Sequence, residues 1–104
     1  MVDLTQNEWQ LQLGQETDAV VIDVRTDYEF DEGCISNAIN LDIYEAQMFM
    51  DTVVSLDKGR SYYVYCKSGS RSSQACALMN QMGFEKTYNL LGGITEWQGA
   101  ITQN

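Results

Sequence analysis

Short apolar runs alternate with helix-like segments along this 104-residue chain, and that alternation is the strongest constraint on its fold. The run Ala19–Ile22 is continuously apolar and too short for a helix, which is typical of a parallel strand buried on both faces. Strands are expected at Val2–Leu4, Ala19–Ile22, Ala38–Ile43, Tyr62–Tyr65 and Thr87–Leu90. Strands that alternate with helices predict an α/β fold, with a parallel sheet and helices on its faces.

Helix signals fill the intervals between these runs. Thr5-Gln6-Asn7-Glu8 has the form of a capping box, which predicts a helix start there and a stop at Gly14. Further helical segments are expected at Asp27–Glu32, Tyr44–Leu56, Ser70–Met82 and Ile94–Gly99. Gly33 and Gly83 follow two of these segments at the position where helices commonly end.

Length and composition predict one globular domain over residues 1–104. The hydrophobic content of 44% is ordinary for a folded domain, and the chain is too short for two. The polar start MVDLTQNEWQ lacks a secretory signal pattern, and no apolar run approaches the ~18 residues of a membrane span. We therefore expect a cytoplasmic protein that does not bind membranes.

Cysteine and histidine usage narrows the chemistry. Cys34, Cys66 and Cys76 are odd in number and widely spaced, which favours free thiols in a reducing compartment over a disulfide framework. Histidine is absent, which excludes His-ligand metal sites and Ser-His or Cys-His catalytic pairs. We expect neither a metal nor a cofactor.

The net charge of −9 is unevenly distributed. Residues 1–52 hold 12 acids and one base, whereas residues 53–104 hold three acids and five bases. No basic stripe is available to neutralise phosphates, so nucleic acid is excluded as a partner. The acidic half is interpreted as a solvated surface in preference to a docking site for a basic partner.

One segment combines the features of a reactive cysteine site. Cys66-Lys67-Ser68-Gly69-Ser70-Arg71-Ser72 joins the Tyr62–Tyr65 strand directly to the helix that follows. Cys66 therefore falls at the carboxyl end of a strand, where α/β sheets bind ligands. The unpaired amides of the helix start, a turn permitted by Gly69 and small serines together predict a cup of N–H donors around one sulfur atom.

This cup has two chemical consequences for Cys66. A free thiol titrates near a pH of about 8.5, and helix N-termini and neighbouring cations lower that value to roughly 3.5–7.5. Lys67 and Arg71 supply cations in an otherwise acidic chain. The same donors can hold an anion that develops on the group attacked by Cys66. Cys76, inside a predicted helix, and Cys34, after a turn glycine, are interpreted as structural.

Four motifs in order resemble the rhodanese family along nearly the whole chain. The first motif is Asp23-Val24-Arg25 followed by Glu29-Phe30, which is similar to the family's DVR and the Glu-Phe pair after it, and the second is Gly33–Asn40, which is similar to GHIxGAxN. The third is Cys66–Arg71, which is similar to the CxxGxR loop. The fourth is Leu91–Ile94 with Trp97 and Ala100, which is similar to LxGGxxxW..A. Cys34 and Asn37 stand where the family usually has His and Gly, and the proline before Gly-Ala is missing. These departures lie away from the Cys66–Arg71 loop and concern the shape of the Gly33–Asn40 segment.

The resemblance implies a fold and a reaction. The fold would be a five-stranded, mainly parallel sheet with helices on both faces. The reaction would be a thiosulfate sulfurtransferase double displacement, in which a donor such as thiosulfate leaves sulfur on Cys66 as a persulfide, and a thiol, cyanide or protein acceptor takes it.

The resemblance also implies roles for individual residues. Cys66 would be the nucleophile, and Lys67, Ser68, Gly69, Ser70 and Arg71 would form the substrate-binding loop. Arg71, with Lys67, would meet the small anionic donor. Asp23 and Arg25 would form an ion-paired support beneath the site.

Two alternatives use the same fold. The phosphatase branch of the superfamily, with its arsenate reductase-like relatives, has Cys-x5-Arg, whereas here Arg71 lies five positions after Cys66. The shorter loop predicts a tighter cup, suited to one sulfur rather than a tetrahedral phosphate. The second alternative is a non-catalytic sulfur-carrier or regulatory module, since fold does not fix function; the intact Cys66 counts against it.

Overall fold

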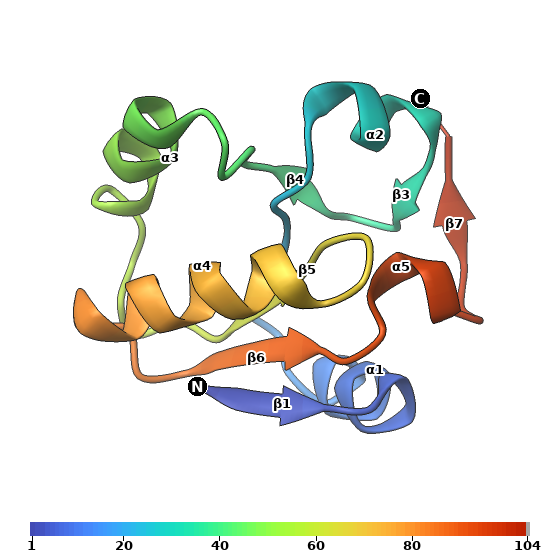
Figure 1. Cartoon of the computed structure of the whole chain (residues 1–104). Helices are drawn as coiled ribbons and strands as arrows, with labels where there is room; N and C mark the ends of the chain where they lie inside the picture. Colours follow the sequence, from blue (N-terminus) through green and yellow to red (C-terminus); the bar gives the residue numbers. More distant parts are fainter. Residues whose placement is uncertain (104) are drawn as a thin grey trace.

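Residues 1–103, described by a computed structural model, build a central sheet of five parallel strands (Figure 1). The strands are β1 (Val2–Leu4), β2 (Val20–Asp23), β4 (Ile39–Asn40), β5 (Tyr62–Tyr65) and β6 (Thr87–Leu90), in the order β1-β6-β5-β2-β4. The predicted α/β class and five-stranded parallel sheet are confirmed. The strand β5, which precedes Cys66, lies at the centre of the sheet and is buried throughout.

Helices cover both faces of this sheet, as predicted. They are α1 (Gln6–Gly14), α2 (Asp27–Glu32), α3 (Ala46–Val53), α4 (Ser70–Gln81) and α5 (Gly93–Glu96). Alternate residues of β5 point to opposite faces: Tyr62 and Val64 pack with α3 and α4, whereas Tyr63 and Tyr65 pack with α1 and the region of α5. The long helix α4 lies across the sheet in Figure 1 and begins beside the end of β5.

The capping box predicted from the sequence is present, because Thr5 and Glu8 form a reciprocal box at the start of α1. Thr26 and Glu29 form a second box at the start of α2, which was not predicted. Each box satisfies backbone donors that the first turn of a helix leaves unpaired. The second box also holds the Glu29 side chain in place through its contacts with Thr26.

Some boundaries differ from the prediction. The helix expected at Tyr44–Leu56 covers only Ala46–Val53, because Tyr44 donates its N–H to the Asp42 carboxylate in a turn (2.9 Å) and residues 54–56 form a tighter turn. The strand expected at Ala38–Ile43 pairs only at Ile39–Asn40 and then crosses the end of β2.

A second, small sheet was not predicted. Its antiparallel strands are β3 (Cys34–Ile35) and β7 (Ile101–Thr102), and the segment expected as a helix at Ile94–Gly99 stops at Glu96 and turns toward β7. Two-residue strands carry no periodic signal, so only the folded chain brings them together.

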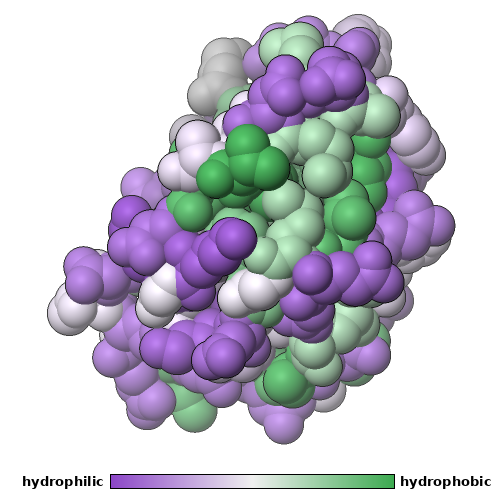
Figure 2. All heavy atoms as spheres, turned by 90° about the vertical axis from the view of Figure 1, so that its left-hand side faces the viewer, coloured by the Kyte–Doolittle hydropathy of each residue, from purple (hydrophilic) through white to green (hydrophobic). Residues whose placement is uncertain are grey.

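Apolar side chains reach the surface around α3. Figure 2 shows this face, with apolar atoms gathered among polar ones, and Met48 and Val54 are 69% and 60% exposed. Within residues 1–103 no helix combines the length and the apolar character that spanning a membrane requires.

Candidate active site

Three strand ends meet at the edge where Cys66 lies. Asp23, the last residue of β2, is in register with Tyr65 of β5 and with Asn40 of β4. Carboxyl ends of parallel strands share one edge of a sheet, so the residues that follow them converge. Cys66 comes directly after Tyr65 and is only 1% exposed. The expected position of the cysteine at the edge of the sheet is therefore confirmed.

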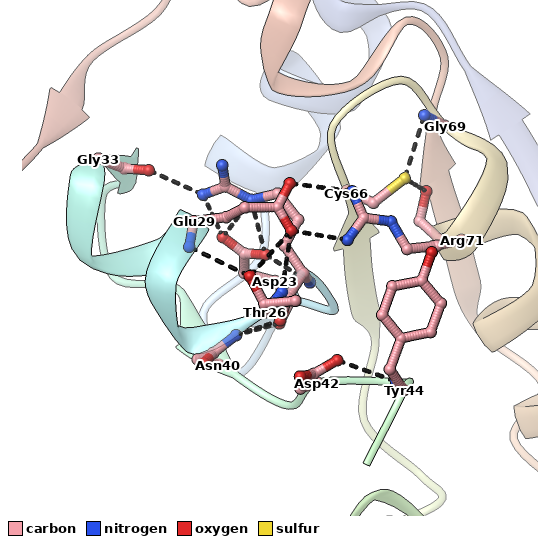
Figure 3. Close-up of polar contacts among 12 residues, drawn as sticks. Asp23, Thr26, Glu29, Gly33, Asn40, Asp42, Tyr44, Cys66, Gly69 and Arg71 are labelled. Atoms are coloured by element: carbon pink, nitrogen blue, oxygen red, sulfur yellow. Dashed lines mark hydrogen bonds and ion pairs between the residues drawn. The ribbon is translucent and has the colours of Figure 1, made fainter. Parts of the chain in front are cut away.

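Backbone and hydroxyl donors surround the Cys66 sulfur. The Gly69 N–H donates to Sγ at 3.1 Å, and the Ser72 hydroxyl lies 3.4 Å from it (Figure 3). Gly69 has φ +105°, a conformation that favours glycine, and this turns the loop back so that its amides face the thiol. The Ser72 hydroxyl also lies 2.5 Å from the Asn89 side-chain oxygen, so its single proton serves one partner at a time.

These donors decide the acidity of Cys66. Burial alone raises the pKa of the thiol, but the Ser72 hydroxyl and the backbone N–H groups of Ser72, Gly69 and Ser68 outweigh it, and the pKa lies below the ordinary cysteine value. Donors that stabilise the thiolate make a buried cysteine nucleophilic. The sequence pattern identified the loop amides, whereas the contribution of the Ser72 hydroxyl was missed.

The closing glycine segment holds the loop from behind. The Ile94 N–H donates to the Cys66 carbonyl at 3.0 Å, and the Thr95 N–H and hydroxyl donate to the Lys67 carbonyl at 3.1 and 2.8 Å. With these carbonyls bound behind the loop, its amides remain available to the sulfur. A Cβ atom on Gly93 would meet the Lys67 carbonyl oxygen at 2.4 Å, so only glycine fits this close approach.

Arg71 is engaged by partners on two sides. Its Nη1 and Nη2 donate to the Glu29 carboxylate at 2.8 and 3.0 Å, and its guanidinium lies 5.4 Å from the centre of the Tyr44 ring. Figure 3 shows the side chain extending from α4 toward Glu29 on α2. The hydrogen bonds to Glu29 raise the pKa of Arg71, and the Cys66 thiolate also contributes. The ion pair with Glu29 was not predicted.

Glu29 is the most consequential residue that the sequence analysis left without a role. Its Oε1 accepts bonds from the Thr26 N–H and hydroxyl (both 3.1 Å) as well as from Arg71. The hydrogen bond from Arg71 is the main reason that the pKa of Glu29 is lowered to about 2. The Thr26-x-x-Glu29 capping signal could have located this carboxylate, but its partner lies 42 residues away.

Asp23 and Arg25 form the expected ion pair. Arg25 Nη2 lies 2.7 Å from Asp23 Oδ2 and donates to the Gly33 carbonyl at 2.7 Å. Asn40 binds the backbone carbonyls of both residues. Asp23 is fully buried and Arg25 is 6% exposed, so this cluster fixes the path of the chain from β2 into α2 and does not contact the sulfur.

The remaining loop side chains point outward. Lys67, Ser68 and Ser70 are exposed, so they reach the mouth of the site rather than its floor. Lys67 borders a hollow of about 360 Å³ that Glu29, Glu32 and Thr95 also line. This hollow adjoins the loop on the side of α2.

The other cysteines have different surroundings. Cys76 lies in α4 with no exposed surface, and burial raises its pKa to about 12. Cys34 is buried in β3. In the part of the chain that the structure describes, no three His, Cys, Asp or Glu side chains come together as metal ligands would.

The geometry agrees with comparisons to known proteins. The family model for the rhodanese-like domain matches residues 6–100. The chain belongs to the rhodanese-like domain family. A sulfurtransferase of Allochromatium vinosum is 36% identical over 85 residues, which cover 82% of this chain and 77% of that protein. The crystal structure of a rhodanese-like domain protein from Staphylococcus aureus superposes with a TM-score of 0.84, at 27% identity, and covers 100% of this chain and 99% of that one.

Another relative combines a similar region with further sequence. A tRNA uridine(34) hydroxylase of Legionella pneumophila is 33% identical over 104 residues, which cover 97% of this chain but 41% of that protein. The rhodanese-like region is therefore shared by proteins with different names.

The departure at Asn37 changes little in the backbone. Asn37 replaces the usual family glycine and adopts φ +69°, in the left-handed region that asparagine tolerates better than most residues. The turn between β3 and β4 therefore keeps a conformation that glycine would also take.

Proposed function

We propose that this protein is a sulfurtransferase that carries sulfur as a persulfide on Cys66. It takes sulfane sulfur from thiosulfate or a related donor and delivers it to a thiol, cyanide or protein acceptor. The observation that carries the proposal is the convergence of a hydroxyl and loop amides on one buried thiol whose pKa is lowered. The sulfurtransferase name of the A. vinosum relative supports it.

In the first half-reaction the Cys66 thiolate attacks the outer sulfur of the donor. A new S–S bond forms, the S–S bond of thiosulfate breaks, and its electron pair leaves with sulfite. The outer sulfur then carries the negative charge, and the N–H groups of Ser68, Gly69 and Ser72 stabilise it as they stabilise the thiolate. No metal and no cofactor take part.

In the second half-reaction the acceptor attacks the outer sulfur of the persulfide. An acceptor thiolate becomes a persulfide, or cyanide becomes thiocyanate, and the electron pair of the broken S–S bond returns to Cys66. The thiolate is again held by Gly69 and Ser72. The loop thus serves both halves of the cycle without moving charged side chains.

Two other functions use the same fold. A phosphatase or arsenate reductase needs room for a tetrahedral oxyanion and a cation aimed at it, whereas here Arg71 binds Glu29. A sulfur carrier would also accept sulfur on a Cys66 thiolate, so only turnover to an acceptor distinguishes it from an enzyme. The free thiols Cys66 and Cys76 support a cytoplasmic location as part of the proposal.

The direct test is to incubate the protein with thiosulfate and to measure its intact mass. We expect a gain of one sulfur atom that cyanide removes with release of thiocyanate. A persulfide that forms but does not turn over would favour the carrier role. Hydrolysis of small aryl phosphates at a rate comparable to sulfur transfer would overturn the proposal.

A further inference from the structure

The charge of Arg71 is already neutralised inside the protein. Both terminal nitrogens of its guanidinium donate to the two oxygens of Glu29, and the two side chains are only 16% and 24% exposed. Tyr44 lies over the guanidinium at 5.4 Å. A dianionic donor that reaches Cys66 therefore meets an ion pair rather than an unpaired cation.

Glu29 does not depend on Arg71 for its position. Thr26 holds Oε1 through its N–H and its hydroxyl, both at 3.1 Å, as part of the cap of α2. Its pKa of about 2 keeps the carboxylate charged throughout the physiological range. The negative charge is therefore a fixed part of the site and cannot swing away when a donor arrives.

The surroundings add space beside the ion pair. The hollow of about 360 Å³ next to the loop is lined by the acids Glu29 and Glu32, by the exposed cation Lys67, and by Arg25, which is buried and paired with Asp23. A hollow of this size falls within the range of small-molecule sites. It has room for the organic part of a larger donor, which thiosulfate lacks.

We propose that Glu29 determines donor specificity by disfavouring dianionic donors such as thiosulfate and favouring thiol persulfides. This inference rests on the proposed function and specifies its donor. The Cys66 thiolate would attack the outer sulfur of R–S–SH; the new S–S bond forms as the old one breaks, the proton stays on the outer sulfur, and RS⁻ leaves. The persulfide group of such a donor is uncharged in this protonated form, whereas thiosulfate carries two negative charges.

The test compares two donors in the wild type and in Glu29→Gln. Glutamine keeps an oxygen for the Thr26 cap but removes the charge, since Glu and Gln both fit a capping box. Coulomb energy is proportional to the charge of the donor. If Glu29→Gln increases kcat/KM for thiosulfate about tenfold, it should increase kcat/KM for a singly charged glutathione persulfide only about threefold. Any change in the acidity of Cys66 affects both donors and cancels in the ratio.

Glu32→Gln is the matched control, because it removes the same charge from the same hollow without touching Arg71. We expect its donor ratio to stay within about twofold of the wild type, since an exposed charge is screened by solvent and salt. An unchanged ratio in Glu29→Gln, or an equal change in Glu32→Gln, would overturn the inference. Failure of both donors to load Cys66 in the wild type would instead overturn the proposed function.

The wild type alone supplies a second measurement. A donor dianion approaches a protein of net charge −9 in which Arg71 is already paired with Glu29 and Lys67 is the exposed cation beside the loop. We expect the net repulsion to outweigh the attraction of Lys67, so salt should raise kcat/KM for thiosulfate by screening it. A steep fall with salt would show that the loop cations attract the donor despite Glu29, and would contradict the inference without any variant.

Discussion

Cys66 and Cys76 are both buried, the first just before α4 and the second within it, and the pKa values of their thiols are shifted in opposite directions. Cys66 is 1% exposed and Cys76 is not exposed at all, yet the pKa of Cys66 is lowered and that of Cys76 is raised to about 12. Burial acts in the same direction on both, because a thiolate loses its hydration in either place. The opposite shifts of the two pKa values therefore come from the hydrogen-bond donors around each sulfur.

The position of each residue relative to the helix explains the donors. Cys66 precedes α4, where the first-turn N–H groups lack intrahelical partners and are free to bind the sulfur. Cys76 lies within α4, where the backbone N–H groups are already used by the helix. One helix thus lowers the pKa of a thiol at its start and gives no such effect to a thiol in its interior.

The largest expected effect comes from exchanging the Cys66 thiol for a hydroxyl. Cys66→Ser should abolish sulfur transfer, because serine lacks an accessible anion near neutral pH and cannot hold a persulfide. Cys76→Ser and Cys34→Ser should keep most of the activity. Turnover of thiosulfate and cyanide measures all three, and activity surviving in Cys66→Ser would contradict the assignment.

The next effect tests the backbone support of the Cys66 loop. Gly93→Ala would drive a methyl group against the Lys67 carbonyl and displace the amides, with a loss of roughly a hundredfold in turnover, as expected for a lost oxyanion-type donor. Gly14→Ala is the control, since a Cβ there meets nothing within 4 Å. Circular dichroism should show both variants folded, and equal activity in the two would refute this role of the loop.

The raised pKa of Cys76 should affect how the free energy of unfolding changes at alkaline pH. Its folded-state pKa is raised, so above the ordinary value of 9.0 the unfolded chain loses a proton that the folded chain keeps until about pH 12. The stability that the protonated thiol contributes to the folded state is therefore present below pH 9 and is lost as pH rises, by about 1.4 kcal/mol per pH unit. Urea unfolding between pH 9 and 11 should show a correspondingly shallower decline in Cys76→Ala, and parallel slopes would contradict the shift.

The smallest effect concerns the single hydroxyl beside Cys66. Ser72→Ala removes a donor from the thiolate and should raise the pKa of Cys66, because a hydrogen bond to a charged group contributes about 1.5 kcal/mol. Ser73→Ala changes the neighbouring serine, whose hydroxyl faces Met1 Sδ at 4.0 Å instead of Cys66. The pH dependence of iodoacetamide alkylation distinguishes them, and identical profiles would leave the amides as the sole cause.

The features that could be predicted from the sequence are local ones. The strand Tyr62–Tyr65 has the predicted bounds, and the start of α4 at Ser70 agrees, because an apolar run, a glycine turn and a helix start follow one another within a few residues. The position of Cys66 at the end of β5 follows from the same succession. The Thr5–Glu8 capping box was predicted in the same way, whereas the Thr26–Glu29 box was not identified from the sequence.

The features that escaped prediction depend on residues far apart in the chain. The ion pair between Arg71 and Glu29 joins α4 to α2, and nothing near either residue specifies the other. The antiparallel pairing of β3 with β7 involves strands of two residues, which are too short to show a period. Such contacts are set by how the parallel sheet positions its connections.

Site-resolved alkylation of the native protein tests the central claim most directly. Iodoacetamide is added at a series of pH values, and peptide mass spectrometry then reports the modified fraction of Cys66 and of Cys76 in the same molecules. We expect Cys66 to react with a midpoint below the ordinary cysteine value and Cys76 to stay unmodified until the protein unfolds. A midpoint for Cys66 at or above that value, or equal reactivity of the two thiols in the folded protein, would contradict the account.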